Sequence, residues 1–192
     1  MRKIILASGS KARRRLLRQI GLRFQAVESG VNESRSLKGG PARFVIRNAL
    51  KKARHVAKRF HSGVVIAADT VVLANKRIIG KPRNVKDALR TIKILSRKPR
   101  WVYTGLAVID IDNRRTYTDY EKTKVYMYPL SEKEITSYFR KVYSLDKAGG
   151  FDIQGLGGIF IDRIEGCFYN VVGLPLAKLA KMLKKVGVRI LS

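Results

Sequence analysis

Apolar residues along the chain follow two periodicities, which together predict five helices and five strands. A spacing of three to four residues predicts helices over residues 11–21, 41–61, 84–95, 131–141 and 174–186. Continuous apolar runs or strict alternation predict strands over residues 3–8, 64–74, 100–111, 115–128 and from 159 onward. Because the two kinds of element mix without strict alternation, the pattern indicates an α/β fold with a mixed sheet.

Capping residues and turns support several of these boundaries. Ser10 is placed to cap the first helix, and Gly21 to end it. Ser131 and Glu134 form the sequence signature of a capping box, and a turn near Asp112 joins the two long strands. The chain has no internal repeat and no linker that would divide it, so we expect a single domain over residues 1–192.

The charge of the chain points to an anionic partner. It holds 41 Lys and Arg residues against 14 Asp and Glu, a formal charge of +27. Such an excess of positive charge suits binding to nucleic acid, a nucleotide or an anionic membrane surface. The alternative is a bias toward basic residues that is shared by proteins of the same lineage. No apolar stretch approaches the roughly 20 residues that span a bilayer, and the apolar segment at the start is too short for a signal peptide. We therefore expect no membrane partner and a cytoplasmic location.

Several kinds of catalytic site are excluded by residue type and spacing. Cys167 is the single cysteine, so the chain has no internal disulfide and no cysteine-based zinc site. His55 and His61 are six residues apart on a predicted helix, which does not place them together as metal ligands. The sequence lacks both the Walker phosphate loop and the dinucleotide-binding glycine motif.

What remains is a set of isolated polar residues at the ends of apolar elements. They are Arg13, Glu33, Lys52, Asp69, Thr70, Lys81 and Gln154. Arg and Lys neutralise phosphate oxygens, carboxylates hold Mg²⁺ or accept a proton from water, and an amide can bind a base edge. Together they describe a nucleotide phosphate site. Two alternatives stay open at this point: Arg13 could be a surface arginine, and Lys52 could extend along the margin of its helix toward solvent.

Six short segments in the same order resemble the Maf family of nucleoside triphosphate pyrophosphatases. They read LASGS with RRLL, AADTVV, GKP, VYTGLAV, DKAGGFDIQG and YNVVGLPL. The resemblance implies a fold related to inosine-triphosphate pyrophosphatases, with an elongated mixed sheet flanked by helices and two lobes around a central cleft. It also implies cleavage between the α- and β-phosphates with a divalent cation, Mg²⁺ or Mn²⁺, and a homodimer.

The same resemblance implies roles for individual residues. Asp69 matches the catalytic aspartate, as a base toward water or as a metal ligand, and Glu33 matches a second metal ligand. Arg13, Lys52 and Lys81 match the basic positions that hold the triphosphate. Thr70 and Gln154 match the branch that acts on dTTP and UTP, where they bear on specificity.

One departure from the family pattern leaves the base preference open. The first helix of the family begins Ser-Pro-Arg-Arg, whereas Ala12 here replaces an arginine associated with specificity in the dTTP/UTP branch. The alternatives are the same chemistry with a different base preference, or a basic nucleic-acid-binding protein without catalysis. Nonspecific nucleic-acid binding could also accompany catalysis, although the basic residues are spread along the chain without an interleaved aromatic platform. The family suggests either removal of unwanted nucleotides or a link to septum formation.

Overall fold

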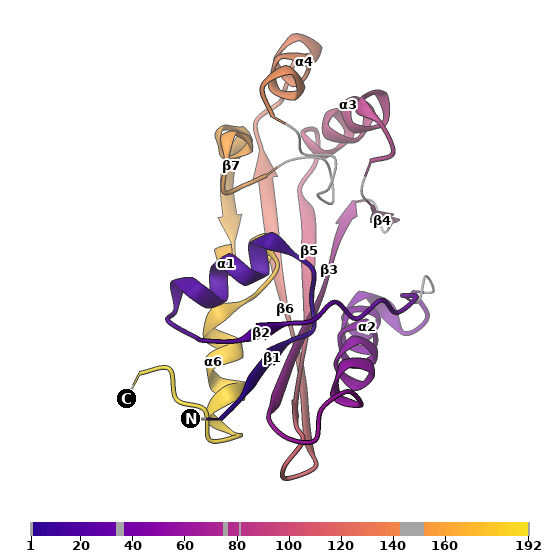
Figure 1. Ribbon diagram of the computed structural model, residues 1–192. Helices are drawn as coiled ribbons and strands as arrows, with labels where there is room; N and C mark the ends of the chain where they lie inside the picture. Colours follow the sequence, from indigo (N-terminus) through magenta and orange to yellow (C-terminus); the bar gives the residue numbers. More distant parts are fainter. Residues whose placement is uncertain (1, 34–36, 75–76, 81, 143–151, 192) are drawn as a thin grey trace. The chain divides into compact units, whose positions relative to one another are not determined.

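The chain folds into a mixed β-sheet flanked by helices in the computed structural model, which describes residues 2–33, 37–74, 77–80, 82–142 and 152–191 (Figure 1). Within these residues the strands are β1 (Ile4–Leu6), β2 (Gln25–Ala26), β3 (Val64–Ala74), β4 (Arg77–Ile79), β5 (Arg100–Asp110), β6 (Arg115–Met127) and β7 (Ile161–Glu165). They are ordered β2-β1-β3-β5-β6-β7, and β4 pairs with β3. The pairs β1–β2 and β1–β3 are parallel, while β3–β4 and β6–β7 are antiparallel. The predicted α/β class with a mixed sheet is confirmed.

The helices lie close to where the sequence predicts them. They are α1 (Lys11–Gln19), α2 (Gly40–Ala57), α3 (Val85–Leu95), α4 (Glu132–Lys141), α5 (Phe168–Val172) and α6 (Leu176–Lys184). The Ser10 side chain accepts from the backbone N–H of Arg13, and the capping box of Ser131 and Glu134 is present at α4. These side chains satisfy N–H groups that have no partner inside their own helix.

Three differences from the predicted elements have local causes. Helix α2 ends at Ala57 rather than near His61, because residues 58–63 turn through Gly63, at φ 110°, into β3. A 3₁₀ helix occupies Leu156–Phe160, so β7 begins at Ile161 instead of Ile159. The short elements β2, β4 and α5 carry too few residues for a periodic pattern.

The chain divides into two compact units. Unit 1 comprises residues 1–70, 104–121 and 173–192, and unit 2 comprises residues 71–103 and 122–172. Each of the strands β3, β5 and β6 contributes residues to both units. Whether the whole chain acts as one domain, and whether a cleft separates two lobes, stay predictions.

The core of unit 1 holds α2 against the sheet. Buried residues of α2, such as Ala49, Ala53 and Val56, cluster with Val65 and Ala107 of the strands. Gly105 of β5 permits this packing, because a Cβ there would lie 2.3 Å from the backbone C and O of Val45 in α2. This close approach brings the backbone of α2 against β5, and α2 carries Asn48 and Lys52.

The core of unit 2 is a separate cluster. Val102 of β5 and Val125 and Met127 of β6 pack with Ile92 of α3 and Ile135 of α4, all of them buried. Alternate residues of β5 and β6 face the other way, so in unit 2 these two strands each have an apolar face toward the core and a second face away from it. Across the residues that the structure describes, no helix is long and apolar enough to cross a membrane.

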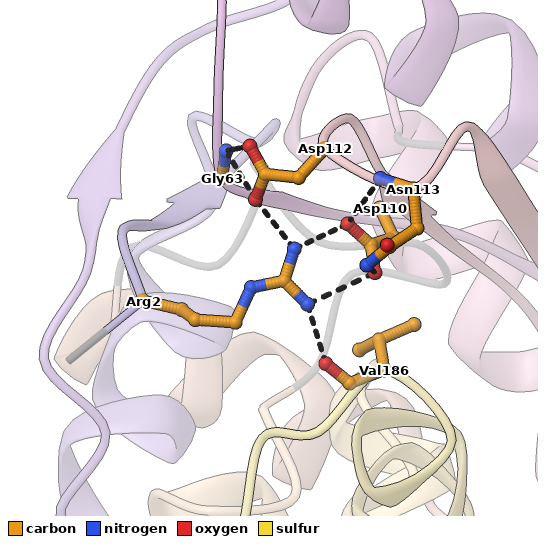
Figure 2. A network of polar contacts seen from close by, with 6 residues as sticks. All are labelled: Arg2, Gly63, Asp110, Asp112, Asn113 and Val186. Carbon is orange, nitrogen blue, oxygen red and sulfur yellow. Dashed lines mark hydrogen bonds and ion pairs between the residues drawn. The ribbon is translucent and has the colours of Figure 1, made fainter.

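A polar network ties together distant parts of unit 1 (Figure 2). The Arg2 guanidinium donates to both carboxylate oxygens of Asp110, to Asp112 Oδ2 at 2.5 Å and to the Val186 carbonyl at 2.6 Å. Asp110 also accepts from the Asn113 side chain at 2.8 Å. The Arg2 guanidinium and Asn113 hold the pKa of Asp110 well below its usual range, against the opposing effect of burial.

Replacing Asp110 with asparagine is expected to lower the free energy of unfolding at pH 7 by about 1–3 kcal/mol. Because the folded pKa is depressed, the stabilisation is complete above the unfolded pKa of about 4 and is lost as the pH falls below it. Denaturant unfolding of the parent and the variant between pH 7 and pH 2 measures this effect. The difference between their free energies of unfolding is expected to become smaller as the pH falls. A difference in free energy of unfolding that does not change with pH would contradict an ionic origin of the stabilisation.

Candidate active site

Asp69 is buried near the end of the unit 1 segment of β3 and receives two side chains from α2. It is 4% exposed. Its Oδ1 accepts from Lys52 Nζ at 2.6 Å, and its Oδ2 accepts from Asn48 Nδ2 at 3.1 Å. Asn48 and Lys52 are four residues apart, so they project from one face of α2. The carboxylate is thus fixed by a donor on each oxygen.

Lys52 also joins the second predicted acidic residue to this group. Its Nζ lies 2.6 Å from Glu33 Oε1, and the Lys52 side chain is 10% exposed while that of Glu33 is 53% exposed. The ammonium is therefore held between a buried carboxylate and a partly solvated one. This resolves the alternatives for Lys52, because the side chain turns inward to Asp69 instead of extending along the surface.

The two carboxylates suit a cation. Among the described residues, no three His, Cys, Asp or Glu side chains gather as a metal site. Asp69 and Glu33 nevertheless converge on one positive charge, which the Lys52 ammonium supplies. Mg²⁺ commonly takes one or two carboxylates and completes its shell with water and substrate phosphates. The donor set therefore fits a divalent cation bound together with a phosphate ligand.

Arg13 is held in place by three acceptors in unit 1. Its Nε donates to the Gly173 carbonyl at 2.9 Å, its Nη1 to Ser8 Oγ at 3.2 Å and its Nη2 to Thr70 Oγ1 at 3.0 Å. Burial lowers the pKa of Arg13, while the negative charges of Asp69 and Glu33 act in the opposite direction. The alternative of an unconstrained surface arginine is therefore excluded.

Thr70, the residue after Asp69 in β3, holds the Arg13 guanidinium through its hydroxyl. Its Oγ1 lies 2.8 Å from Thr104 Oγ1 in addition to the contact with Arg13. Gly173, at φ 112°, presents its carbonyl to Arg13, and a Cβ there would lie 3.4 Å from Thr70 Oγ1. Two neighbouring residues of one strand thus organise two polar groups, one anionic and one cationic.

The start of α1 places the remaining residues of the first motif. Ser8 Oγ accepts from the Ser10 N–H at 3.2 Å as well as from Arg13. Ala12 lies half-buried in the first turn. Arg14, which the helical pattern directs toward solvent together with Arg15 and Arg18, is half-buried and its Nε is buried, whereas the other two are exposed.

Two predicted site residues are not brought into this group by the described structure. Gln154 belongs to unit 2, where its backbone N–H donates to Asp152 Oδ1 at 3.0 Å. Lys81 lies outside the described residues. The prediction of their roles stays untested.

Asn48, Ser8 and Gly173 are site residues that the pattern analysis missed. Asn48 could have been found from its spacing of four residues before Lys52, which puts a buried amide beside the buried ammonium on α2. Gly173 acts on Arg13 across 160 residues of sequence, and no local pattern connects them. Ser8 lies five residues before Arg13, so the short motif that holds both could have pointed to it.

Comparison with known proteins adds a family and a fold. A family model described as "Maf-like protein" matches residues 3–186. A protein of Methanosarcina barkeri named dTTP/UTP pyrophosphatase is 44% identical over 191 residues, which is 99% of this chain and 97% of that protein. A protein of the same name from Bacillus cereus is 43% identical over 188 residues, 98% of this chain and 97% of that protein. The solved structure of the Staphylococcus aureus Ham1 protein matches with a TM-score of 0.54 at 13% identity, covering 96% of this chain and 99% of that one, which shows a shared fold.

Proposed function

Since the chain belongs to the Maf family and is a nucleoside triphosphate pyrophosphatase, we propose that it cleaves dTTP and UTP into the monophosphate and pyrophosphate. The observation that carries the proposal is the convergence of Lys52 and Asn48 on the buried Asp69 carboxylate, with Glu33 on the same ammonium. The base preference follows the names of the relatives.

Asp69 is the catalytic residue in this proposal. Water attacks phosphorus, the phosphoanhydride bond between the α- and β-phosphates breaks, and a carboxylate oxygen of Asp69 takes the proton that the water loses. Asn48 and Lys52 each hold one oxygen, so the carboxylate keeps its orientation without being reorganised in each turnover. The burial of Asp69 limits competition from bulk water for the same oxygens.

Three cations neutralise the triphosphate. Lys52 and Arg13 lie in unit 1, and the sequence motif assigns the same role to Lys81. A guanidinium has five N–H groups, and in the described structure three groups of Arg13 have acceptors, one on each nitrogen. The N–H groups that remain on Nη1 and Nη2 suit phosphate oxygens, and the three acceptors keep the fork from rotating. Arg13 is thus proposed as an oriented phosphate ligand.

A divalent cation, Mg²⁺ or Mn²⁺, would be held by Asp69 and Glu33 together with the substrate phosphates, where it would neutralise charge on the phosphate oxygens. The partial exposure of Glu33 allows its carboxylate to exchange Lys52 for another cation at low cost. Homodimer formation and a cytoplasmic location stay predictions from the sequence.

Specificity for the base is assigned to Thr70, Gln154 and position 12. Thr70 acts through Arg13, because its hydroxyl is occupied by Arg13 and Thr104. Gln154 offers an amide that can both donate to and accept from a pyrimidine edge. Ala12 has no polar group to contribute, so discrimination at that position is expected to be weaker than with an arginine.

The test is pyrophosphate release from dTTP, UTP, CTP, GTP and 7-methyl-GTP, each with Mg²⁺, with Mn²⁺ and with a chelator. The expected result is a kcat/KM for dTTP and UTP about tenfold or more above the others, since one well-placed hydrogen-bonded contact is worth about 1.4 kcal/mol or more. Chelation is expected to abolish release. Preference for another base would overturn the substrate assignment. Pyrophosphate release that a chelator does not affect would overturn the proposed dependence on a divalent cation.

A further inference from the structure

A second candidate surface lies in unit 2, on the sheet face opposite to its core. Val102 and Val125 point into the core, so their strand neighbours point away from it. The residues Trp101, Tyr103, Lys122, Lys124, Tyr126 and Arg163 make up this surface, which we name the aromatic–basic face. Arg163 belongs to it because it is the partner of Tyr126 in the β6–β7 register.

Rings and cations alternate across the aromatic–basic face. The ammonium groups of Lys122 and Lys124 lie 5.5 and 5.8 Å from the ring centroid of Trp101. Lys124 is also 4.9 Å from the ring centroid of Tyr126, over which the Arg163 guanidinium stacks at 3.7 Å. The Trp101 side of the face is open to solvent, with Trp101 37% exposed. Residues from three strands thus bring rings and cations together in space, which the spread of basic residues along the sequence did not indicate.

The acidic partners of Arg163 are exposed and weakly held. Arg163 pairs with Asp162 at 3.0 Å and with Glu165 at 3.7 Å, and all three side chains are at least 36% exposed. Exposed pairs of this kind are worth at most about 1 kcal/mol, so a phosphate can replace them. Tyr126 and Glu165 raise the pKa of Lys124, which keeps its charge through the neutral range.

We propose that the aromatic–basic face binds single-stranded nucleic acid. Bases stack on the exposed Trp101 ring and on the Arg163 guanidinium that covers Tyr126, and the lysines between them contact the phosphates that join successive bases. Two stacking positions with lysines between them suit linked bases rather than a single nucleotide. A second copy of the chain suits the face poorly, because a twofold contact would bring Lys122, Lys124 and Arg163 close to their own counterparts. The charge of +27 on the whole chain favours a polyanion.

The experiment uses the one tryptophan of the chain, which is Trp101 itself. The purified full-length protein is titrated with short oligouridylate and oligothymidylate at low salt, while tryptophan emission is followed. The expected result is saturable quenching by both strands, with an affinity that falls steeply as salt rises. The absence of quenching at low salt would overturn the proposal.

A matched pair of double variants distinguishes binding at the aromatic–basic face from binding caused by the overall positive charge of the protein. Tyr126→Leu with Lys124→Gln removes a ring and a cation from the face. Tyr117→Leu with Lys185→Gln removes a similar pair in unit 1, where the ammonium lies 5.5 Å from the ring. We expect the first variant to bind about tenfold or more weakly, from the loss of stacking, and the second to bind within about threefold of the parent. Equal weakening of oligonucleotide binding in both variants would overturn the assignment of the binding site to the aromatic–basic face.

Two further measurements distinguish other occupants. Tryptophan emission that changes when only the protein concentration is varied would indicate that two copies of the chain associate through this face. Quenching by dTTP or UTP at concentrations near their KM would indicate a nucleotide site. Quenching by vesicles of anionic lipid, but not by oligonucleotides, would indicate a membrane surface. Each of these outcomes would overturn the proposal.

Discussion

Replacing Asp69 with asparagine is expected to lower kcat/KM for pyrophosphate release about a thousandfold or more. Asparagine has nearly the shape of aspartate, but its amide neither takes a proton from water nor carries the charge that a cation requires. The fold should persist, because Lys52 keeps Glu33 as an ionic partner and is not left as an uncompensated buried charge. Single-turnover and steady-state rates of release from dTTP, measured for both proteins, give the size of the loss.

A control with the same chemical change is available on the surface. Asp119, 44% exposed, pairs with Lys178 at 3.3 Å, and its replacement by asparagine is expected to leave the rate within twofold. Binding of dTMP and the melting temperature of the Asp69→Asn variant show whether the site is still assembled. If the variant is folded and binds dTMP but its rate of pyrophosphate release falls less than tenfold, Asp69 is not the catalytic residue.

Replacing Gly105 with alanine is expected to lower the free energy of unfolding by roughly 3 kcal/mol or more, at the upper end of the range for overpacking. The new Cβ would lie 2.3 Å from the backbone C and O of Val45 and 2.6 Å from Ile46 N. These are main-chain atoms of a helix, so no side chain can rotate away and α2 itself must move. For a chain of this length the melting temperature should fall by about 6–12 °C.

The same substitution should also lower catalysis, because α2 carries Asn48 and Lys52. A shift of the helix moves both donors away from Asp69, so kcat is expected to fall at temperatures where the variant is still folded. Gly80→Ala is the matched control for stability. Among the residues that the structure describes, a Cβ at Gly80 meets no atom within 4 Å, so the melting temperature of this variant should change little. If the Gly105→Ala variant melts like Gly80→Ala, the sheet accommodates the methyl group and the packing argument fails.

Local patterns predicted most of the fold. The apolar run of β3 and the caps at Ser10 and Ser131 are confirmed, because each depends on residues within one turn or one strand. The short strand β4 and the 3₁₀ helix before β7 escaped prediction, since tertiary contacts rather than periodicity define them.

The candidate site was predictable only in part. Asp69, Lys52 and Glu33 are prominent in the sequence as charges at the ends of apolar elements, and the structure joins all three. The orientation of Arg13 depends on Gly173 and Thr70, which are 160 and 57 residues away. The aromatic–basic face is visible only in part along the sequence: Lys122, Lys124 and Tyr126 share one face of β6. The remaining ring and cation positions come from β5 and β7.

The Arg2 network has a consequence for the connectivity of the chain. Arg2 donates to the carbonyl of Val186, so the first described residues and the segment that follows α6 lie side by side in unit 1. A short flexible peptide could therefore close the backbone into a ring, and new ends could be opened in the exposed turn of residues 97–99. Such a circular permutant would keep both polar groups around β3 intact.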